Sequence, residues 1–232
     1  MVSALIVAAG RSRRMGFDKI FAPLAGKPVL YHSLRAFSDC ADIDEILVVT
    51  HEDRVNDVER LVEDEGLTKV SKVVTGGAER HMSVWNGLQA VESKGSEYVA
   101  IHDGARALTT PQVISECLRM ARENGAACCA SQIPDTVKRA SPEQMVTESV
   151  ERTGLWAMQT PQIFASSLIL QAYASVIAKH EMVTDEVSAV QKLGTRIALL
   201  KNDDWNFKIT FPPDLELAEH VLALRAKKLA AR

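Results

Sequence analysis

A segment near the start of the chain combines a small-residue turn with concentrated positive charge. The turn is Ala8-Ala9-Gly10, directly after an apolar run. Four cations then lie within nine residues: Arg11, Arg13, Arg14 and Lys19. Backbone N–H groups of such a turn approach phosphate closely, and basic side chains supply the opposing charge. The segment has neither the lysine spacing of a Walker A loop nor the pattern GxGxxG. We interpret it as a triphosphate-binding loop, with a basic surface loop as the alternative.

A carboxylate follows another apolar run, in the sequence His102-Asp103-Gly104-Ala105-Arg106. At the carboxyl end of a strand and facing a basic phosphate loop, Asp103 is suited to hold Mg²⁺ or a substrate hydroxyl. Aspartate before glycine also commonly caps its own turn, so both interpretations stay open. We interpret His102 as a packed strand residue.

Paired glycines, Gly76 and Gly77, precede a predicted helix that contains Ser83. Glycine backbone lets a base or a ribose lie directly against the chain, although a simple strand-to-helix turn explains the pair equally well.

Hydroxyl and amino groups in the second half complete the candidate chemistry. Thr160 and Thr184 lie in predicted turns, and Thr184 is equally suited to be the N-cap of a helix. Lys208 lies in an apolar, strand-like context, where a lysine is costly to bury unless it meets an anion.

The elements that position these residues alternate in a β-α rhythm. Four short apolar runs predict strands buried on both faces: 4–8, 45–50, 72–75 and 98–102. Segments with helical periodicity lie between or after them: 29–37, 54–65, 79–91 and 111–123. This order predicts an α/β fold with a mostly parallel sheet and helices on both faces. Ligands of such sheets bind beyond the carboxyl ends of the strands, where the candidate residues fall.

The second half departs from that rhythm. Residues 133–156 are polar and mixed, and two β-prone stretches, 136–139 and 145–151, flank a turn-like Ala-Ser-Pro-Glu. We therefore predict a hairpin that projects from the sheet. Helices at 166–179 and 184–193, a strand at 196–200 and a helix from about residue 214 complete the prediction. We expect residues 1–232 to form one domain with an arm.

Composition excludes several classes of function. The formal net charge is −3 and aromatic residues make up 5% of the chain, which disfavours a nucleic-acid or anionic membrane partner. The first apolar run is too short to span a bilayer. The four cysteines show no CxxC pair, which indicates reduced thiols rather than a zinc or disulfide scaffold. We expect a cytoplasmic protein.

Seven segments, taken in order, resemble the 2-C-methyl-D-erythritol 4-phosphate cytidylyltransferases of the non-mevalonate isoprenoid pathway. AAGRSRRM is similar to that family's AAGxGxRM loop, GGAERHMSVWNGL to GGxxRxxSVxxGL, and HDGARA to HDAARP. IPDTVKR, ERTGLWAMQTPQIF, TDEVSAV and NFKITFPPDL then follow in the family's order. Each motif alone is weak, but their order over nearly the whole chain is specific.

The resemblance implies a Rossmann-like nucleotidyltransferase fold and a homodimer joined through the β-arm at about 133–156. It implies that the phosphate of methylerythritol phosphate attacks the α-phosphorus of CTP, with Mg²⁺ or another divalent cation as cofactor. Arg14 and Lys19 would be catalytic, and Asp103 is a candidate metal ligand. Nucleotide binding is implied for Ala8, Ala9, Gly10, Gly76, Gly77, Ser83 and Gly104. Acceptor positioning is implied for Arg152, Lys208, Asp103, Thr136, Thr184 and Thr160, with Thr136 and Arg152 coming from the partner's arm.

Four positions depart from the family pattern. Ser12 replaces a loop glycine, Asp18 stands where many relatives have proline, Ala78 replaces an acidic residue of some members, and Ala107 replaces a proline. None of these departures removes a proposed catalytic group. We expect them to affect the contacts to cytosine most.

Three other functions remain as alternatives. A ribitol-5-phosphate cytidylyltransferase shares the fold and donor, but the TDEVSA segment favours methylerythritol phosphate as acceptor. A sugar-1-phosphate nucleotidyltransferase is permitted by the AAG loop but not suggested by DTVKR or TPQ. A catalytically silent nucleotide-binding protein would have no need of Arg14, Lys19 and Lys208, all of which are present.

Overall fold

A central seven-stranded sheet organises the computed structural model, which describes residues 1–10, 12, 15–92 and 95–230. Its strands are β1 (Val2–Val7), β4 (Glu45–Thr50), β5 (Val70–Thr75), β6 (Tyr98–Asp103), β7 (Ala126–Gln132), β10 (Trp156–Ala165) and β11 (Ala198–Lys201). Their order across the sheet is β11-β7-β10-β6-β1-β4-β5. All neighbours pair in parallel except β10, which runs antiparallel to both β6 and β7. The predicted mostly parallel sheet is therefore confirmed.

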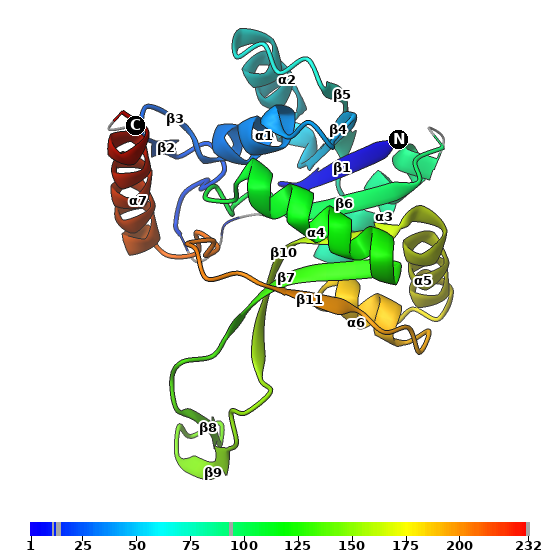
Figure 1. Ribbon diagram of the computed structural model, residues 1–232, viewed down its shortest axis with the longest axis vertical. Coiled ribbons are helices and arrows are strands. Elements are labelled where there is room, and N and C mark those ends of the chain that lie inside the picture. Colours follow the sequence, from blue (N-terminus) through cyan, green and yellow to red (C-terminus); the bar gives the residue numbers. More distant parts are fainter. Residues whose placement is uncertain (11, 13–14, 93–94, 231–232) are drawn as a thin grey trace.

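Helices cover both faces of this sheet, as predicted (Figure 1). One face packs against α1 (Val29–Asp39), α2 (Val55–Asp64) and α4 (Pro111–Asn124). The other packs against α3 (Arg80–Glu92), α5 (Ser166–Ala178) and α6 (Glu186–Gln191). Strand side chains alternate between the layers: Ile6 lies in the first apolar cluster and Leu5 in the second, both fully buried. This two-sided burial explains the continuous apolar runs of the central strands.

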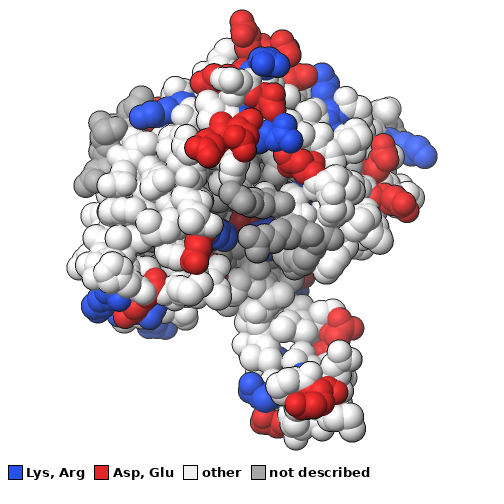
Figure 2. All heavy atoms as spheres, turned by 180° about the vertical axis from the view of Figure 1, so that it is seen from behind, with Lys and Arg blue, Asp and Glu red and all other residues white. Residues whose placement is uncertain are grey.

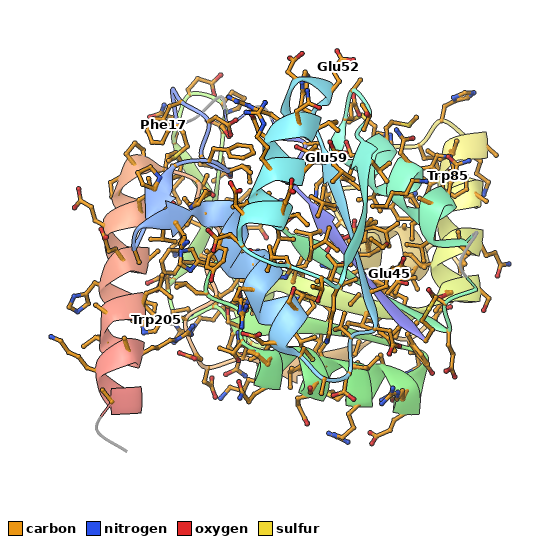
Figure 3. All side chains as sticks on the ribbon, turned by 90° about the horizontal axis from the view of Figure 1, so that it is seen from above. Phe17, Glu45, Glu52, Glu59, Trp85 and Trp205 are labelled. Carbon is orange, nitrogen blue, oxygen red and sulfur yellow. The ribbon has the colours of Figure 1, made fainter. Side chains whose placement is uncertain are left out.

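The last helix, α7 (Pro212–Ala230), forms a smaller third layer beside the two-stranded β2 (Pro23–Leu24) and β3 (Lys27–Pro28). Figure 3 shows α7 along one side of the body, with Phe17 and Trp205 on that same side. Arg225 of α7 donates to the carbonyls of Leu108 and Trp205, which fixes the helix to the loop after β6. Within the described ranges, no helix is both long and apolar enough to cross a bilayer.

A narrow arm projects from the body between β7 and β10, as predicted for residues 133–156 (Figure 1). Its outer part is the hairpin of β8 (Val137–Ala140) and β9 (Val146–Val150), joined antiparallel. Met145 and Val146 near the turn are each 68% exposed. In the view of Figure 2, acidic and basic side chains are interspersed over the body and the arm, with no broad surface of one sign.

Three expectations about the elements need correction. β5 is an edge strand with partly exposed residues, so the prediction that it is buried on both faces is wrong. Residues 206–210, predicted to be strand-like, form an irregular segment. Two strands of the sheet, β7 and the inner part of β10, were not predicted at all.

Candidate active site

The carboxyl ends of β1, β5 and β6 meet at one edge of the sheet, and two cavities open there. The first, which we name the loop cavity, has a volume of about 900 Å³ and is lined by Ala8, Ala9, Gly10, Gly76, Gly77, Ser83 and Lys19, among others. The second, the arm cavity, has a volume of about 930 Å³ and reaches the base of the arm at Gly154 and Trp156. Arg80, Asp103 and Lys208 line both cavities. We name these three residues the shared wall.

Close backbone packing shapes the loop cavity. A Cβ atom on Gly76 would lie 2.6 Å from Cβ of Ala9, and one on Gly77 would lie 2.5 Å from Cβ of Met82. Ser83 is 2% exposed, and its Oγ accepts from the Gly77 N–H at 3.1 Å. Gly76 is therefore needed for the close approach of the turn after β1, Gly77 for the close packing of its turn on the start of α3, and Ser83 holds their conformation.

Lys19 brings a positive charge to the loop cavity from the segment after the basic loop. Its ammonium donates to the carbonyl of Ile209 at 2.7 Å, next to Lys208 in sequence, and the residue is only 8% exposed. Residues from opposite ends of the chain thus bring two lysines to one site. Arg14, the other predicted catalytic cation, lies outside the described residues.

Two departures from the family pattern have local partners around Lys19. Ser12 has a φ of +49°, in the left-handed region that favours glycine, and its Oγ accepts from the Lys19 N–H at 3.3 Å. Asp18 accepts from the Ile20 N–H at 3.1 Å and pairs with Arg54 at 2.9 Å. The serine and aspartate side chains therefore fix the segment by hydrogen bonds, where glycine and proline would act through the backbone.

Asp103, at the end of β6, is the centre of the shared wall. Its carboxylate lies 3.2 Å from Nη2 of Arg80, 2.9 Å from Nζ of Lys208 and 3.7 Å from Nε of Arg106. Burial alone would raise the pKa of Asp103, but Arg80, Lys208 and Arg106 together hold this pKa well below its usual range. Asp103 is therefore ionised throughout the physiological range, and it fixes three cations.

Arg80 and Glu186 belong to the same network, and sequence reasoning missed both. Arg80 donates to Glu186 through Nη1 at 2.5 Å and through Nη2 at 3.1 Å. Burial lowers the pKa of Arg80, but Glu186 and Asp103 outweigh it and raise this pKa well above its ordinary value. Arg80 stands in the quoted GGAER segment, a signal that could have identified it. Glu186 stands in the quoted TDEVSAV segment, two residues after Thr184.

Thr160 and His102 hold the turn that begins at Asp103 by hydrogen bonds to its backbone. The ring nitrogen Nε2 of His102 lies 3.2 Å from the Arg106 carbonyl and must donate to it, so Nδ1 accepts from the Thr160 hydroxyl at 2.9 Å. Oγ1 of Thr160 in turn accepts from the Asp103 N–H at 3.1 Å. Thr160 thus lines the arm cavity and orients Asp103 through its backbone. His102 is packed, as predicted, and neutral.

The stability of the protein should fall on mild acidification because of His102. Burial lowers the pKa of His102 to about 3, and the neighbouring Asp103 carboxylate opposes this effect only in part. The unfolded chain binds this proton below about pH 6.5, so the free energy of unfolding should fall by up to about 1.4 kcal/mol per pH unit from there toward pH 3. Urea unfolding at pH 7, 6 and 5 measures this slope. His102→Gln should be less stable at pH 7, and its free energy of unfolding should depend less steeply on pH. The dependence that remains is expected from His32, because burial also lowers the pKa of that residue. Equal slopes in both proteins would contradict the assignment.

The other predicted residues fall into three groups. Thr184 lines the arm cavity, but the N-cap of α6 is Asp185, so that part of the prediction is wrong. Gly104 lines neither cavity: its N–H donates to the Val7 carbonyl at 2.9 Å, within the core. Thr136 and Arg152 are exposed on the arm, outside both cavities, and Arg152 donates to the Pro134 carbonyl.

The residues present do not fit a protein-held magnesium ion. Among the described residues, no group of three His, Cys, Asp or Glu side chains could hold a metal ion. Both carboxylate oxygens of Asp103 face cations, which disfavours the metal role predicted for it. The site instead presents fixed positive charge around one carboxylate, suited to binding phosphate oxygens.

Comparisons with known proteins bear directly on this site. Residues 2–224 match the model of a family described as IspD, 2-C-methyl-D-erythritol 4-phosphate cytidylyltransferase. A protein of that name from Caldanaerobacter subterraneus subsp. tengcongensis is 41% identical over 221 residues, covering 94% of this chain and 97% of the relative. A protein of the same name from Symbiobacterium thermophilum is 39% identical over 230 residues, covering 98% of this chain and 95% of the relative.

Solved structures agree with the sequence matches. The crystal structure of 4-diphosphocytidyl-2C-methyl-D-erythritol synthase from Anaerococcus prevotii superposes with a TM-score of 0.83 at 28% identity, covering 96% of each chain. The crystal structure of 2-C-methyl-D-erythritol 4-phosphate cytidylyltransferase from Thermus thermophilus superposes with a TM-score of 0.78 at 30% identity, covering 94% of this chain and 98% of the other. The arm, the sheet and both cavities lie within residues 2–224, the range that the family model matches.

Proposed function

Because the chain belongs to the 2-C-methyl-D-erythritol 4-phosphate cytidylyltransferase family, we propose that its two cavities bind CTP and 2-C-methyl-D-erythritol 4-phosphate on either side of the shared wall. The enzyme transfers the cytidylyl group to the acceptor phosphate and releases pyrophosphate. The single observation that carries this assignment of the cavities is that Arg80, Asp103 and Lys208 line both of them. Two substrates bound there would bring their phosphates together at three charged side chains.

The reaction needs positioning and positive charge more than a base. An oxygen of the acceptor phosphate, already ionised, attacks the α-phosphorus of CTP, and the bond from that phosphorus to the β-phosphate oxygen breaks. Negative charge on the pentacoordinate phosphorus is then greatest, and preorganised cations stabilise it. Lys19 lines the loop cavity and is held by the Ile209 carbonyl, which supports this role. For Arg14 the role rests on the family motif.

The nucleotide is assigned to the loop cavity and the acceptor to the arm cavity. The Ala8-Ala9-Gly10 turn and Gly76-Gly77 offer the backbone surface that a nucleotide requires. Thr184 and Thr160 line the arm cavity, and Lys208 faces it from the shared wall, which suits a polyol phosphate. Gly104 is not part of this proposal, because its N–H is bonded within the core.

Magnesium enters this proposal with the substrate. Since no group of three described His, Cys, Asp or Glu side chains could hold the ion, and both carboxylate oxygens of Asp103 face cations, we propose that CTP binds as its magnesium complex, with the metal ligated mainly by phosphate oxygens. Residues 1–232 act as one catalytic unit with an arm, and the cytoplasmic location expected from composition stays a prediction.

We propose that the arm serves the site of a partner subunit in a homodimer. Arg152 and Thr136 lie on the arm and outside both cavities of their own chain, while the arm's exposed Met145 and Val146 suit an interface. Arg152→Ala should mainly weaken use of the acceptor, raising its KM with little change in that for CTP.

Mixing two impaired variants, at an acceptor concentration well below the raised KM of Arg152→Ala, tests whether the arm crosses to the partner. In a dimer of Arg152→Ala with Lys19→Ala, one site keeps both the native lysine and the native arm. Random mixing at equal amounts should then restore about a quarter of wild-type activity, because half of the dimers carry one such site of two. An increase in the KM for CTP alone, or no restored activity on mixing, would show that Arg152 does not serve the partner's acceptor site.

Product identification tests the reaction itself. Incubation with CTP, Mg²⁺ and methylerythritol 4-phosphate should give a compound that mass spectrometry identifies as the cytidine diphosphate ester of methylerythritol. Pyrophosphate should appear in equal amount. Failure to form the ester while CTP binds would support the silent nucleotide-binding alternative.

A further inference from the structure

Glu186 is a fully buried carboxylate that lines neither cavity. It is the first residue of α6, whose start is fixed by Asp185, which accepts from the Ser188 N–H at 3.0 Å. Gln162 of β10 also accepts from the Val187 N–H at 3.0 Å. The carboxylate is therefore held rigidly in the core, and it cannot touch a substrate.

The partners of Glu186 connect it to the shared wall. Arg80 binds both of its oxygens in a fork, and the Tyr173 hydroxyl donates to Oε1 at 3.0 Å. Tyr173 is itself fully buried, so this hydrogen bond comes from inside the protein. A carboxylate buried to this degree is stable only when it is paired and hydrogen-bonded, and Arg80 and Tyr173 satisfy that requirement.

The same guanidinium reaches Asp103 less closely. Nη2 and Nε of Arg80 lie 3.2 Å and 3.4 Å from Oδ1 of Asp103, whereas Lys208 lies 2.9 Å from Oδ2. Arg80 is thus bound mainly by Glu186, and Asp103 remains the principal partner of Lys208. Without the Glu186 charge, Arg80 would form its fork with Asp103 and compete with Lys208 for Oδ2.

We propose that Glu186 is a positioning residue for acceptor binding. It neutralises Arg80 from within the core, so that Asp103 keeps Lys208 at the wall between the cavities. This inference rests on the proposed function, because it takes the acceptor phosphate to be the ligand of Lys208. Three cations and two carboxylates make up the network: Arg80, Arg106, Lys208, Asp103 and Glu186.

Glu186→Gln keeps the shape of the side chain and removes its charge. We expect the KM for methylerythritol phosphate to rise about tenfold or more, while that for CTP changes by less than about threefold. The difference is expected because Glu186 acts through Arg80, whereas Lys19 is held at the loop cavity by the Ile209 carbonyl. The matched control is Glu181→Gln, which removes an exposed ion pair with Lys192 and should leave both constants unchanged.

A double-mutant cycle separates positioning from a purely structural role. If Glu186 acts through Lys208, then in a Lys208→Ala enzyme the substitution Glu186→Gln should change the acceptor KM by less than about twofold. Effects that multiply fully would overturn the proposal. An unchanged acceptor KM in the single variant, with activity lost only in proportion to unfolded protein, would also overturn it.

Thermal melting shows whether the glutamine variant folds. If Glu186→Gln does not fold, Tyr173→Phe replaces it as the test. This variant removes one hydrogen bond to Oε1 of Glu186 and keeps the two hydrogen bonds from Arg80. We then expect a rise of about two- to fivefold in the acceptor KM, and unchanged kinetics would overturn the proposal. Wild-type turnover is measured beside each variant. A wild-type enzyme inactive with this acceptor would refute the proposed function, whereas an active wild type with an unaffected variant would refute only the role of Glu186.

Discussion

Lys19→Ala should lower kcat by about 10²- to 10³-fold, the loss typical when one preorganised group that stabilises transition-state charge is removed. The reason is the position of the Lys19 ammonium, which lines the loop cavity and is aimed by the Ile209 carbonyl at 2.7 Å. KM for CTP should rise much less than kcat falls, because the backbone turns that surround the nucleotide are unchanged. Steady-state kinetics with both substrates varied measures the two effects separately.

The fold should survive this substitution. Lys19 lies in a turn outside the sheet, and its named partner, the Ile209 carbonyl, also belongs to an irregular segment. The matched control is Lys27→Ala, which removes a partly exposed lysine paired with Glu65, outside both cavities, and should leave turnover unchanged. A Lys19→Ala enzyme with native melting temperature and unchanged kcat would refute the transition-state role of this lysine.

Lys208→Ala should lower kcat/KM for the acceptor by about 10²-fold, close to the cost of removing one charged group from a partly buried ion pair that also binds substrate. Its ammonium lies 2.9 Å from Asp103 and lines both cavities. Without Lys208, the acceptor phosphate loses a cation that would bind it. The carboxylate oxygen Oδ2 of Asp103 also loses its ammonium partner, and its negative charge then repels the anionic substrate. Both effects act mainly on the acceptor.

A control for the lysine lies on the strand that precedes this segment. Lys201 pairs with exposed Asp203, and Lys201→Ala should leave kinetics unchanged. Lys208→Arg should recover only part of the activity, because a guanidinium would compete with Arg80 for Asp103. If Lys208→Ala raised only the KM for CTP, the acceptor would have to be assigned to the other cavity.

The sequence predicts the first half of the fold well because three of its strands, β1, β4 and β6, are buried on both faces. Runs such as 45–50 contain mostly Ile, Leu and Val, which are typical of central parallel strands, and β4 has the predicted bounds. The positions of Gly76, Gly77 and Asp103 then follow from the rule that loops after parallel strands form the site.

The strands that were missed have weak local signals. β7 reads AACCASQ, and alanine is depleted in strands, so only burial between β10 and β11 makes the segment a strand. β10 contains Pro161 and three glutamine or threonine residues, a pattern that argues against a central strand. Tertiary pairing overrides local preference in both.

The Arg80–Glu186 pair could not be predicted for a different reason. The two residues are 106 positions apart, and only the packing of α3 and α6 on the same face of the sheet brings them together. Separately, each has an ordinary local explanation, as a charged residue near the start of a helix. Asp103 was recognised, but its role as the partner of three cations depends on distances that no motif contains.

Pyrophosphate release with CTP and Mg²⁺ tests the central claim most directly, with methylerythritol 4-phosphate compared against ribitol 5-phosphate at equal concentration. We predict rapid release with methylerythritol phosphate and little with ribitol phosphate. Preference for ribitol phosphate would keep the cytidylyl transfer and contradict the assigned acceptor. Absence of release with both acceptors would contradict the account as a whole.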